Sequence, residues 1–263
     1  MVAVILFWLG AVFGSFAGAV TYRLKAKKDW VRARSQCESC GHQLSGLDLV
    51  PILSWLGLRG RCRYCGQKIG ISNLLIEVLL GLVFAASYIF WPQDLAGGQW
   101  LLFVTWLAAS IGLAILALYD FRWMILPNKV LYPTLYVALA GRLAYVLLYS
   151  NRISHDLMQL VLSVAVASGL FWAIYIGSKG KMIGFGDVRL GLVTGTLLAE
   201  PQKAALMIFF GSLLGSLFAI PSLAAKKTTL SARLPYGPFL IAATVMVMLF
   251  GDSIIDWYRG LLA

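Results

Sequence analysis

Four cysteines are the residues of this chain whose spacing most directly indicates a chemical role. They form two C-x-x-C pairs, Cys37 with Cys40 and Cys62 with Cys65, and a glycine follows each pair directly. Glycine suits the tight turn that directs backbone N–H groups at sulfur, and two such pairs can hold one zinc ion through four thiolates. Zinc with four sulfur ligands has no open coordination position, so we expect a structural site. His42 is an alternative to one of the four ligands.

Two disulfide bonds are the other use that these four cysteines allow. Residues 23 to 72, which contain them, include ten lysines and arginines. Basic residues gather in the cytoplasmic loops of membrane proteins, and structural disulfides are rare in the reducing cytoplasm. The surroundings of the cysteines therefore favour a metal site.

Acidic side chains are scarce, and three of the 11 stand at or inside the predicted cytoplasmic membrane boundary: Glu77, Asp120 and Asp187. An ionisable group at that depth is costly unless it has a partner or a task. Two carboxyl groups brought together in a desolvated place share one proton, so one can act as a general base on water and the other as a general acid on an amide. Asp120 and Asp187 therefore predict aspartic protease chemistry.

A structural alternative exists for both aspartates. Asp120 and Arg122 would form one ion pair at the membrane boundary, and Asp187 and Arg189 would form another. Charged residues gather at membrane boundaries whatever their role, so position alone leaves both interpretations open.

Several other residues are predicted to support the site or the packing around it. Gly184 and Gly186 precede Asp187 and permit close approach of another backbone. Glu77 begins the second predicted span, and we expect it to have a structural role or to face the substrate. The spacings Gly191-x-x-x-Gly195 and Gly211-x-x-x-Gly215 predict closely packed helices.

The composition requires these residues to be positioned by membrane helices. The chain is 60% hydrophobic, only 13% charged, and has a mean hydropathy of +0.82. A soluble fold of this composition would lack the polar surface to cover its core. The net charge of +11 does not indicate nucleic acid, because no basic stripe with interleaved aromatic residues appears. Apolar runs predict an all-α polytopic protein with about eight spans, near residues 2–22, 73–91, 101–119, 130–149, 157–177, 188–199, 204–224 and 237–257.

The basic residues orient these spans. An arrangement with both ends outside places 18 of the 22 lysines and arginines on the cytoplasmic side. The span at 188–199 is the shortest and is expected to be tilted, thin or re-entrant. The predicted domains are a first transmembrane helix (1–22), a cytoplasmic zinc-binding domain (23–72) and a seven-helix membrane domain (73–263).

These residues together resemble the type IV prepilin peptidases, a family of bacterial membrane proteins related to the GxGD aspartic proteases. The resemblance rests on motifs in a common order along most of the chain. They are Gly14-Ser-Phe, Tyr22-Arg-Leu, the two cysteine pairs with Ser54-Trp-Leu-Gly-Leu-Arg-Gly-Arg between them, Glu77 after Ile71-Ser-Asn, Asp120 with Leu126-Pro-Asn, Gly184-x-Gly-Asp, and Leu234-Pro-Tyr-Gly-Pro-Phe.

The resemblance implies a multi-pass enzyme of the bacterial inner membrane, with membrane lipids as its surroundings. It implies that Asp120 and Asp187 cut the short basic leader from type IV prepilins or pseudopilins at the cytoplasmic face, for pilus assembly or protein secretion. Many members then methylate the new N-terminus with S-adenosylmethionine, an activity associated with the cysteine loop. The rival hypotheses are a proton-coupled transporter and a zinc-stabilised membrane scaffold, in which the aspartates relay protons or hold helices together.

Overall fold

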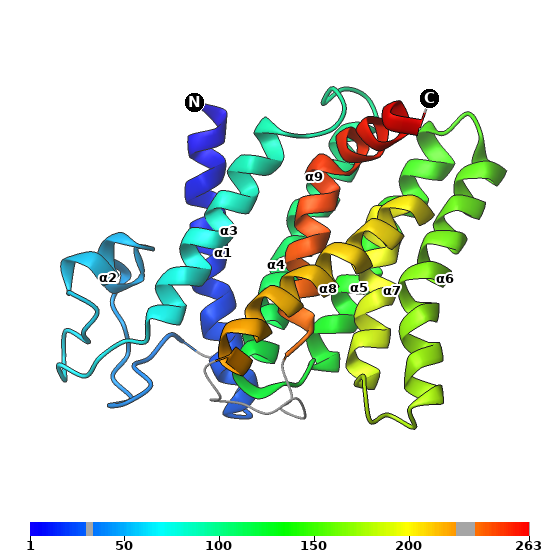
Figure 1. Ribbon diagram of the computed structural model, residues 1–263. Helices are drawn as coiled ribbons and strands as arrows, with labels where there is room; N and C mark the ends of the chain where they lie inside the picture. The colour runs from blue at the N-terminus through cyan, green and yellow to red at the C-terminus, as the bar shows by residue number, and fades with distance from the viewer. Residues whose placement is uncertain (30–33, 225–234, 263) are drawn as a thin grey trace. The chain divides into compact units, whose positions relative to one another are not determined.

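The fold is helical throughout the described part of the chain. The computed structural model describes residues 1–29, 34–224 and 235–262, and these contain helices and two isolated β-bridges (Figure 1). Among these described residues, seven helices are long and apolar enough to cross a membrane. They are α1 (Val2–Lys25), α3 (Ile71–Ile89), α4 (Gln99–Trp123), α5 (Asn128–Tyr149), α6 (Ile153–Gly177), α8 (Pro201–Ala224) and α9 (Gly237–Leu262).

The eighth predicted span is a shorter helix. Helix α7 (Phe185–Leu198) has 14 residues, so it is about 21 Å long against about 30 Å for the hydrocarbon core. It ends where Ala199 adopts the left-handed conformation (φ 53°), and α8 begins at Pro201 directly afterwards. The membrane-helix class is therefore confirmed: among the described residues, seven helices are full-length candidates and α7, the eighth predicted span, is shorter.

The chain divides into two compact units, Met1–Ile89 and Phe90–Ala263. The first unit joins α1 and α3 to the cysteine-containing segment, which carries the short helices η1 (Gly46–Leu49) and α2 (Leu53–Gly57). The second unit contains α4 to α9. The predicted boundaries at residues 22 and 72 fall inside the first unit, because the two helices that flank the cysteine segment pack on each other.

Glycines set the distance between α1 and α3. A Cβ atom at Gly14 would lie 2.6 Å from the Cα atom of Glu77, and one at Gly10 would lie 2.6 Å from the Leu80 carbonyl oxygen. Gly18, one turn further along α1, has no neighbour closer than 3.6 Å. The two helices therefore touch backbone to backbone over part of their length, as small residues permit in membranes.

Glycines also allow close backbone contact between α6 and α7 in the second unit. A Cβ atom at Gly191 would lie 2.6 Å from the Ala167 carbonyl oxygen, and one at Gly195 would lie 2.9 Å from the Cα atom of Val164. The Ser163 hydroxyl also donates to the Gly195 carbonyl across this contact (2.8 Å). Close packing is thus found at the first predicted glycine pair. At Gly211 and Gly215 the nearest atoms lie at 3.3 and 3.6 Å, so the second pair is less crowded.

We predict that Gly14→Ala destabilises the first unit by about 1–3 kcal/mol, because the methyl group must push α1 away from α3. Thermal unfolding of the purified protein in detergent measures the effect. Gly18→Ala is the matched control, and it should be neutral or slightly stabilising because alanine favours the helix. Equal unfolding temperatures for the two variants would contradict the close contact.

Candidate functional site

Asp120 lies in the last turn of α4 and is only 6% exposed. Its Oδ2 atom accepts a hydrogen bond from the Gly237 backbone N–H at 3.1 Å. Gly237 is the first residue of α9, and the N-terminal end of a helix stabilises a carboxylate through unpaired N–H groups and the helix dipole. A buried carboxylate is thus held by the start of a helix more than a hundred residues later in the chain.

Asp187 lies in the first turn of α7 and is half-buried. Its backbone N–H donates to the Gly184 carbonyl (3.1 Å), which fixes the start of the helix. The Asp120 carboxylate is close enough to act on it electrostatically. The structure therefore brings together the two aspartates that the sequence singled out, from α4 and α7 of the same unit.

Tyr236, directly before Gly237, lies next to this site. It also lies close enough to interact electrostatically with Asp187, its hydroxyl lies 3.2 Å from the Ser212 hydroxyl of α8, and its ring packs edge-on against Phe171 of α6. Tyr236 thus connects this site to α6 and α8. In the sequence this segment is indicated only by the family motif Leu234-Pro-Tyr-Gly-Pro-Phe, of which Leu234 lies outside the described residues.

The ion-pair alternative does not describe Asp187. The Arg189 guanidinium donates to the Asn128 side chain and lies 4.7 Å from the centre of the Phe185 ring. Other carboxylates within residues 1–29, 34–224 and 235–262 do form ion pairs, among them Asp48, Asp156, Glu200, Asp252 and Asp256. Arg189 is thus held by Asn128 and Phe185, and it has no ion pair with Asp187 in the described residues.

The two predicted glycines differ in what they require. A Cβ atom at Gly186 would lie 3.2 Å from the Leu126 side chain, so this position allows close approach to the Leu-Pro-Asn segment. At Gly184 the nearest atoms are Asp187 Oδ2 at 3.7 Å and the Gly186 nitrogen at 3.9 Å, which is ordinary contact. Only Gly186 is needed for tight packing.

Glu77 belongs to the first unit, where it is 8% exposed. Its Oε2 atom accepts the backbone N–H of Ile52 at 2.7 Å, and Ile52 has the unusual positive φ of 62° for a β-branched residue. Glu77 therefore anchors the cysteine segment to α3. This contact agrees with a structural role.

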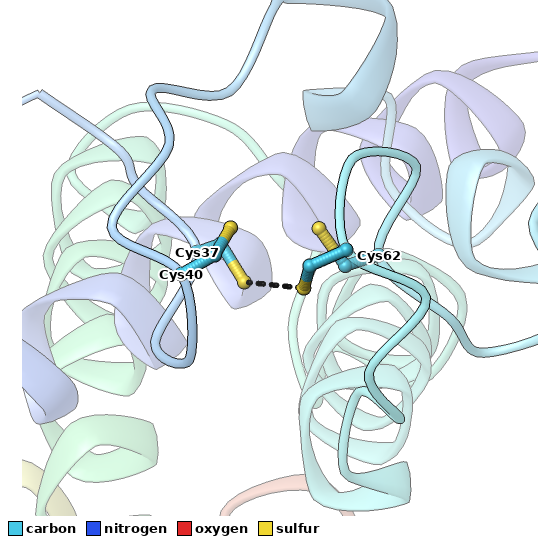
Figure 2. A group of neighbouring side chains, drawn as sticks. Cys37, Cys40 and Cys62 are labelled. Carbon is cyan, nitrogen blue, oxygen red and sulfur yellow. Dashed lines mark hydrogen bonds between the residues drawn. The ribbon is translucent and has the colours of Figure 1, made fainter.

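The four cysteines form one cluster in the first unit, with all four sulfur atoms within 4.8 Å of one another. Figure 2 shows Cys37 and Cys40 facing Cys62 across the gap between the two pairs. The Cys37 and Cys65 sulfur atoms are 3.9 Å apart, and all four thiols are free. Tetrahedral zinc with bonds of about 2.3 Å requires sulfur atoms about 3.8 Å apart, whereas a disulfide requires about 2 Å. The cluster has the dimensions of a metal site.

Both cysteine pairs use the same backbone turn. Gly41 donates to the Cys37 carbonyl (3.0 Å) and Gly66 donates to the Cys62 carbonyl (2.9 Å), with φ of 72° and 71°. Positive φ is the conformation that favours glycine. The structure thus contains two equivalent turns, each presenting a pair of thiols to the other.

The thiols influence one another. Burial raises the pKa of the Cys37 thiol, but the backbone N–H groups of Cys40 and Ser39 and the neighbouring thiols lower it to about 7. The Gln67 N–H lowers the pKa of Cys65, yet burial and the other three sulfur atoms raise it to about 11. The Cys37 thiol therefore loses its proton more readily than the Cys65 thiol does. A bound cation would favour the thiolate form of all four, because its positive charge compensates their negative charges.

Neighbouring side chains brace the second pair. Asp48 pairs with Arg63 (2.8 Å) and accepts from the Tyr64 hydroxyl (3.0 Å). The His42 ring lies on the Tyr64 ring, with centroids 3.7 Å apart, and is not part of the sulfur cluster. His42 therefore links the two pairs from outside the cluster.

Comparisons with known proteins agree with this two-part organisation. Residues 8–91 match the family described as "Bacterial Peptidase A24 N-terminal domain", and residues 107–220 match the "Type IV leader peptidase family". No solved structure matches the chain.

Relatives in several bacteria are similar over much of their length. A protein of Bacillus subtilis (strain 168) is 30% identical over 254 residues, covering 97% of this chain and 96% of the relative. One of Aeromonas salmonicida is 32% identical over 230 residues, covering 86% and 74%. One of Myxococcus xanthus is 48% identical over 84 residues, covering 32% and 25%. Each is named "Prepilin leader peptidase/N-methyltransferase".

The cysteine geometry predicts that the purified chain carries about one tightly bound metal ion, since four converging thiolates form a complete ligand set. Elemental analysis by mass spectrometry measures the content. Cys62→Ser should lose most of the metal, whereas Ser39→Ala, a change at a residue beside the cluster that is not a ligand, should retain it. A metal-free wild-type protein with intact thiols would contradict the site.

Proposed function

Because the chain belongs to the type IV leader peptidase family, we propose that it is an aspartic endopeptidase of type IV prepilins whose catalytic pair is Asp120 and Asp187. Membership in this family makes it a multi-pass membrane enzyme with peptidase activity, as the motifs implied. The juxtaposition of the two carboxyl groups, at the end of α4 and the start of α7, is the observation that carries the proposal.

The contacts of the two aspartates suggest different roles for them. The Asp120 carboxylate accepts a hydrogen bond from the Gly237 N–H, and such a bond stabilises the charged form of a carboxylate. We therefore assign Asp120 as the general base that takes a proton from water. Asp187 then holds the proton that is delivered to the leaving amine of the cleaved peptide bond.

The substrate is a protein with an apolar helix and a short basic leader. We propose that this helix lies among the membrane spans, with its leader in the cytoplasm and the scissile bond level with the aspartates. The prediction that most lysines and arginines lie on the cytoplasmic side supports this orientation in the bacterial inner membrane. Water then reaches the site from the cytoplasm.

The first unit is proposed to hold a structural zinc ion and to carry the methyl-transfer step. It contains a cavity of about 400 Å³ between α1, α3 and the cysteine segment, lined by Tyr22, Trp55, Asn73 and Glu77 among others. The Trp55 indole N–H is buried without a partner within the described residues. This volume and these groups fit S-adenosylmethionine, with the Glu77 carboxylate facing its positive charge and the indole N–H offered to an acceptor. When bound, that molecule supplies the methyl group for the new N-terminal amine.

Product mass from a prepilin mixed with the purified protein tests both activities. Wild-type protein should remove the leader, and added S-adenosylmethionine should increase the product mass by one methyl group. Asp120→Asn and Asp187→Asn should each abolish cleavage, because neither variant can share a proton between two carboxyl groups. Asp94→Asn, at an exposed loop position, is the control and should cleave normally. Full cleavage by either catalytic variant would exclude the assigned pair and favour the scaffold or transporter hypothesis.

Gly237→Ala should lower the rate of cleavage by about 10²-fold, because misplacing a catalytic group by about 1 Å has an effect of that size. A Cβ atom there would lie 2.6 Å from Asp120 Oδ2. Gly215→Ala on α8, where the nearest atom lies at 3.6 Å, is the matched control and should cleave at the normal rate. Single-turnover rates measure the difference. A normal rate in Gly237→Ala would show that this amide does not position Asp120.

A further inference from the structure

The second unit contains a polar cavity at the end opposite the aspartates. Its volume is about 490 Å³, and its lining includes the last residues of α7, Leu197 and Leu198. Asp187 lies in the first turn of the same helix, so the cavity and the catalytic pair are separated by most of its length. Neither peptide cleavage nor methyl transfer, as proposed above, uses this cavity.

Arg142 places a positive charge on the wall of this cavity. It lies seven residues before the end of α5, about 10 Å inside the helix. Among residues 1–29, 34–224 and 235–262, its guanidinium group makes one long hydrogen bond, to the Leu198 carbonyl at 3.5 Å, and it lies 5.9 Å from the centre of the Tyr145 ring. No ion pair of Arg142 is found in the described parts of the chain. Most of its five N–H donors therefore have no acceptor among the described residues. An arginine inside a membrane helix is energetically costly without an acceptor, so these donors indicate a bound group.

A second donor in the lining of this cavity lacks an acceptor among the described residues. The Trp91 indole nitrogen is buried and has no hydrogen-bond partner among the described residues. Its ring is fixed edge-on against Phe103, with centroids 5.1 Å apart. Buried N–H groups almost always have a partner, so Trp91 and Arg142 together indicate a site for an anionic oxygen group.

Carboxylates also line the cavity, which argues against a simple anion. Lys203 is shared by Glu200 (2.9 Å) and Asp252 (2.8 Å), so one ammonium group compensates two carboxylates. Asp156 accepts from the Ser150 hydroxyl (2.7 Å) and lies 3.2 Å from His155. Glu200 and Asp156 act electrostatically on Arg142 without pairing with it directly.

Arg259, another cation of the lining, does not compensate these carboxylates. Arg259 is exposed, lies 3.6 Å from Asp256, and donates to the Gln202 side chain at 2.6 Å. One part of the cavity thus offers unfilled donors and a positive charge, and a nearby part offers excess negative charge. A ligand that satisfies both must carry both charges.

We propose that this cavity binds a zwitterionic head group in which a phosphate is joined by a short chain to a primary ammonium. The phosphate oxygens accept hydrogen bonds from the Arg142 guanidinium and the Trp91 indole N–H, and the ammonium donates to the Glu200 and Asp156 carboxylates. The same chemistry is available from an aminophospholipid of the membrane and from soluble phosphoethanolamine. The site is independent of the peptidase proposal, because none of these residues belongs to the catalytic pair.

Binding to the full-length protein in detergent tests the proposal. The probes are short-chain phosphatidylethanolamine, phosphatidylcholine and phosphatidylglycerol, together with soluble phosphoethanolamine, and calorimetry measures their affinities. Phosphatidylethanolamine should bind at least tenfold more tightly than phosphatidylcholine, whose trimethylated nitrogen has no N–H to donate, and than phosphatidylglycerol, which has no ammonium. Binding of phosphoethanolamine alone at comparable affinity would identify a soluble ligand, and preference for the lipid would identify a membrane ligand.

Three variants assign the site. Arg142→Gln and Trp91→Phe should each weaken binding at least tenfold. Trp91→Phe removes only the N–H donor, so it tests the site even if Arg142→Gln fails to fold. Arg152→Gln changes an exposed arginine outside the cavity lining and should bind as the wild type does. Unchanged affinity in Trp91→Phe and in folded Arg142→Gln, or equal affinity for the three lipids, would overturn the proposal.

Discussion

The hydrogen bond from the Gly237 backbone to Asp120 is the interaction on which the arrangement of the second unit depends. A carboxylate at the end of an apolar helix needs a compensating partner, and here it is the beginning of α9. The contact leaves no room for a side chain at position 237, because a Cβ atom would lie 2.6 Å from the carboxylate oxygen. One amide therefore fixes where α9 starts and keeps Asp120 close to Asp187.

The first unit solves a different problem, which is to hold a polar segment of irregular backbone against two apolar helices. Close contact between α1 and α3 at Gly10 and Gly14 creates the support, and the Glu77 carboxylate secures the segment through the Ile52 amide. The sulfur cluster then joins the two turns of the segment to each other. Since a small loop domain buries little apolar surface, a metal is the natural source of its remaining stability.

Much of this organisation could be predicted from the sequence, because it depends on patterns that are local. Apolar runs locate the seven long helices, C-x-x-C pairs locate the sulfur cluster, and isolated acids at helix ends locate Asp120 and Asp187. Contacts between distant segments were beyond such patterns. Nothing local indicates that Gly237 donates to Asp120, that Glu77 accepts from Ile52, or that Arg189 turns to Asn128 instead of Asp187. The shortness of α7 was foreseen from its apolar run, whereas the polar groups gathered at its far end were not.

The length of α7 connects the two polar regions of the second unit. A helix of 14 residues is about 9 Å shorter than the hydrocarbon core, so both of its ends cannot reach the membrane surfaces together. Its first turn contains Asp187, and the carbonyl of its last residue, Leu198, accepts the hydrogen bond from Arg142. A longer helix would place both groups nearer to bulk water, where carboxyl groups lose the desolvation that the proposed sharing of one proton requires. On the proposed function, the short helix keeps Asp187 away from bulk water, and the same shortness leaves space for a polar cavity at its other end.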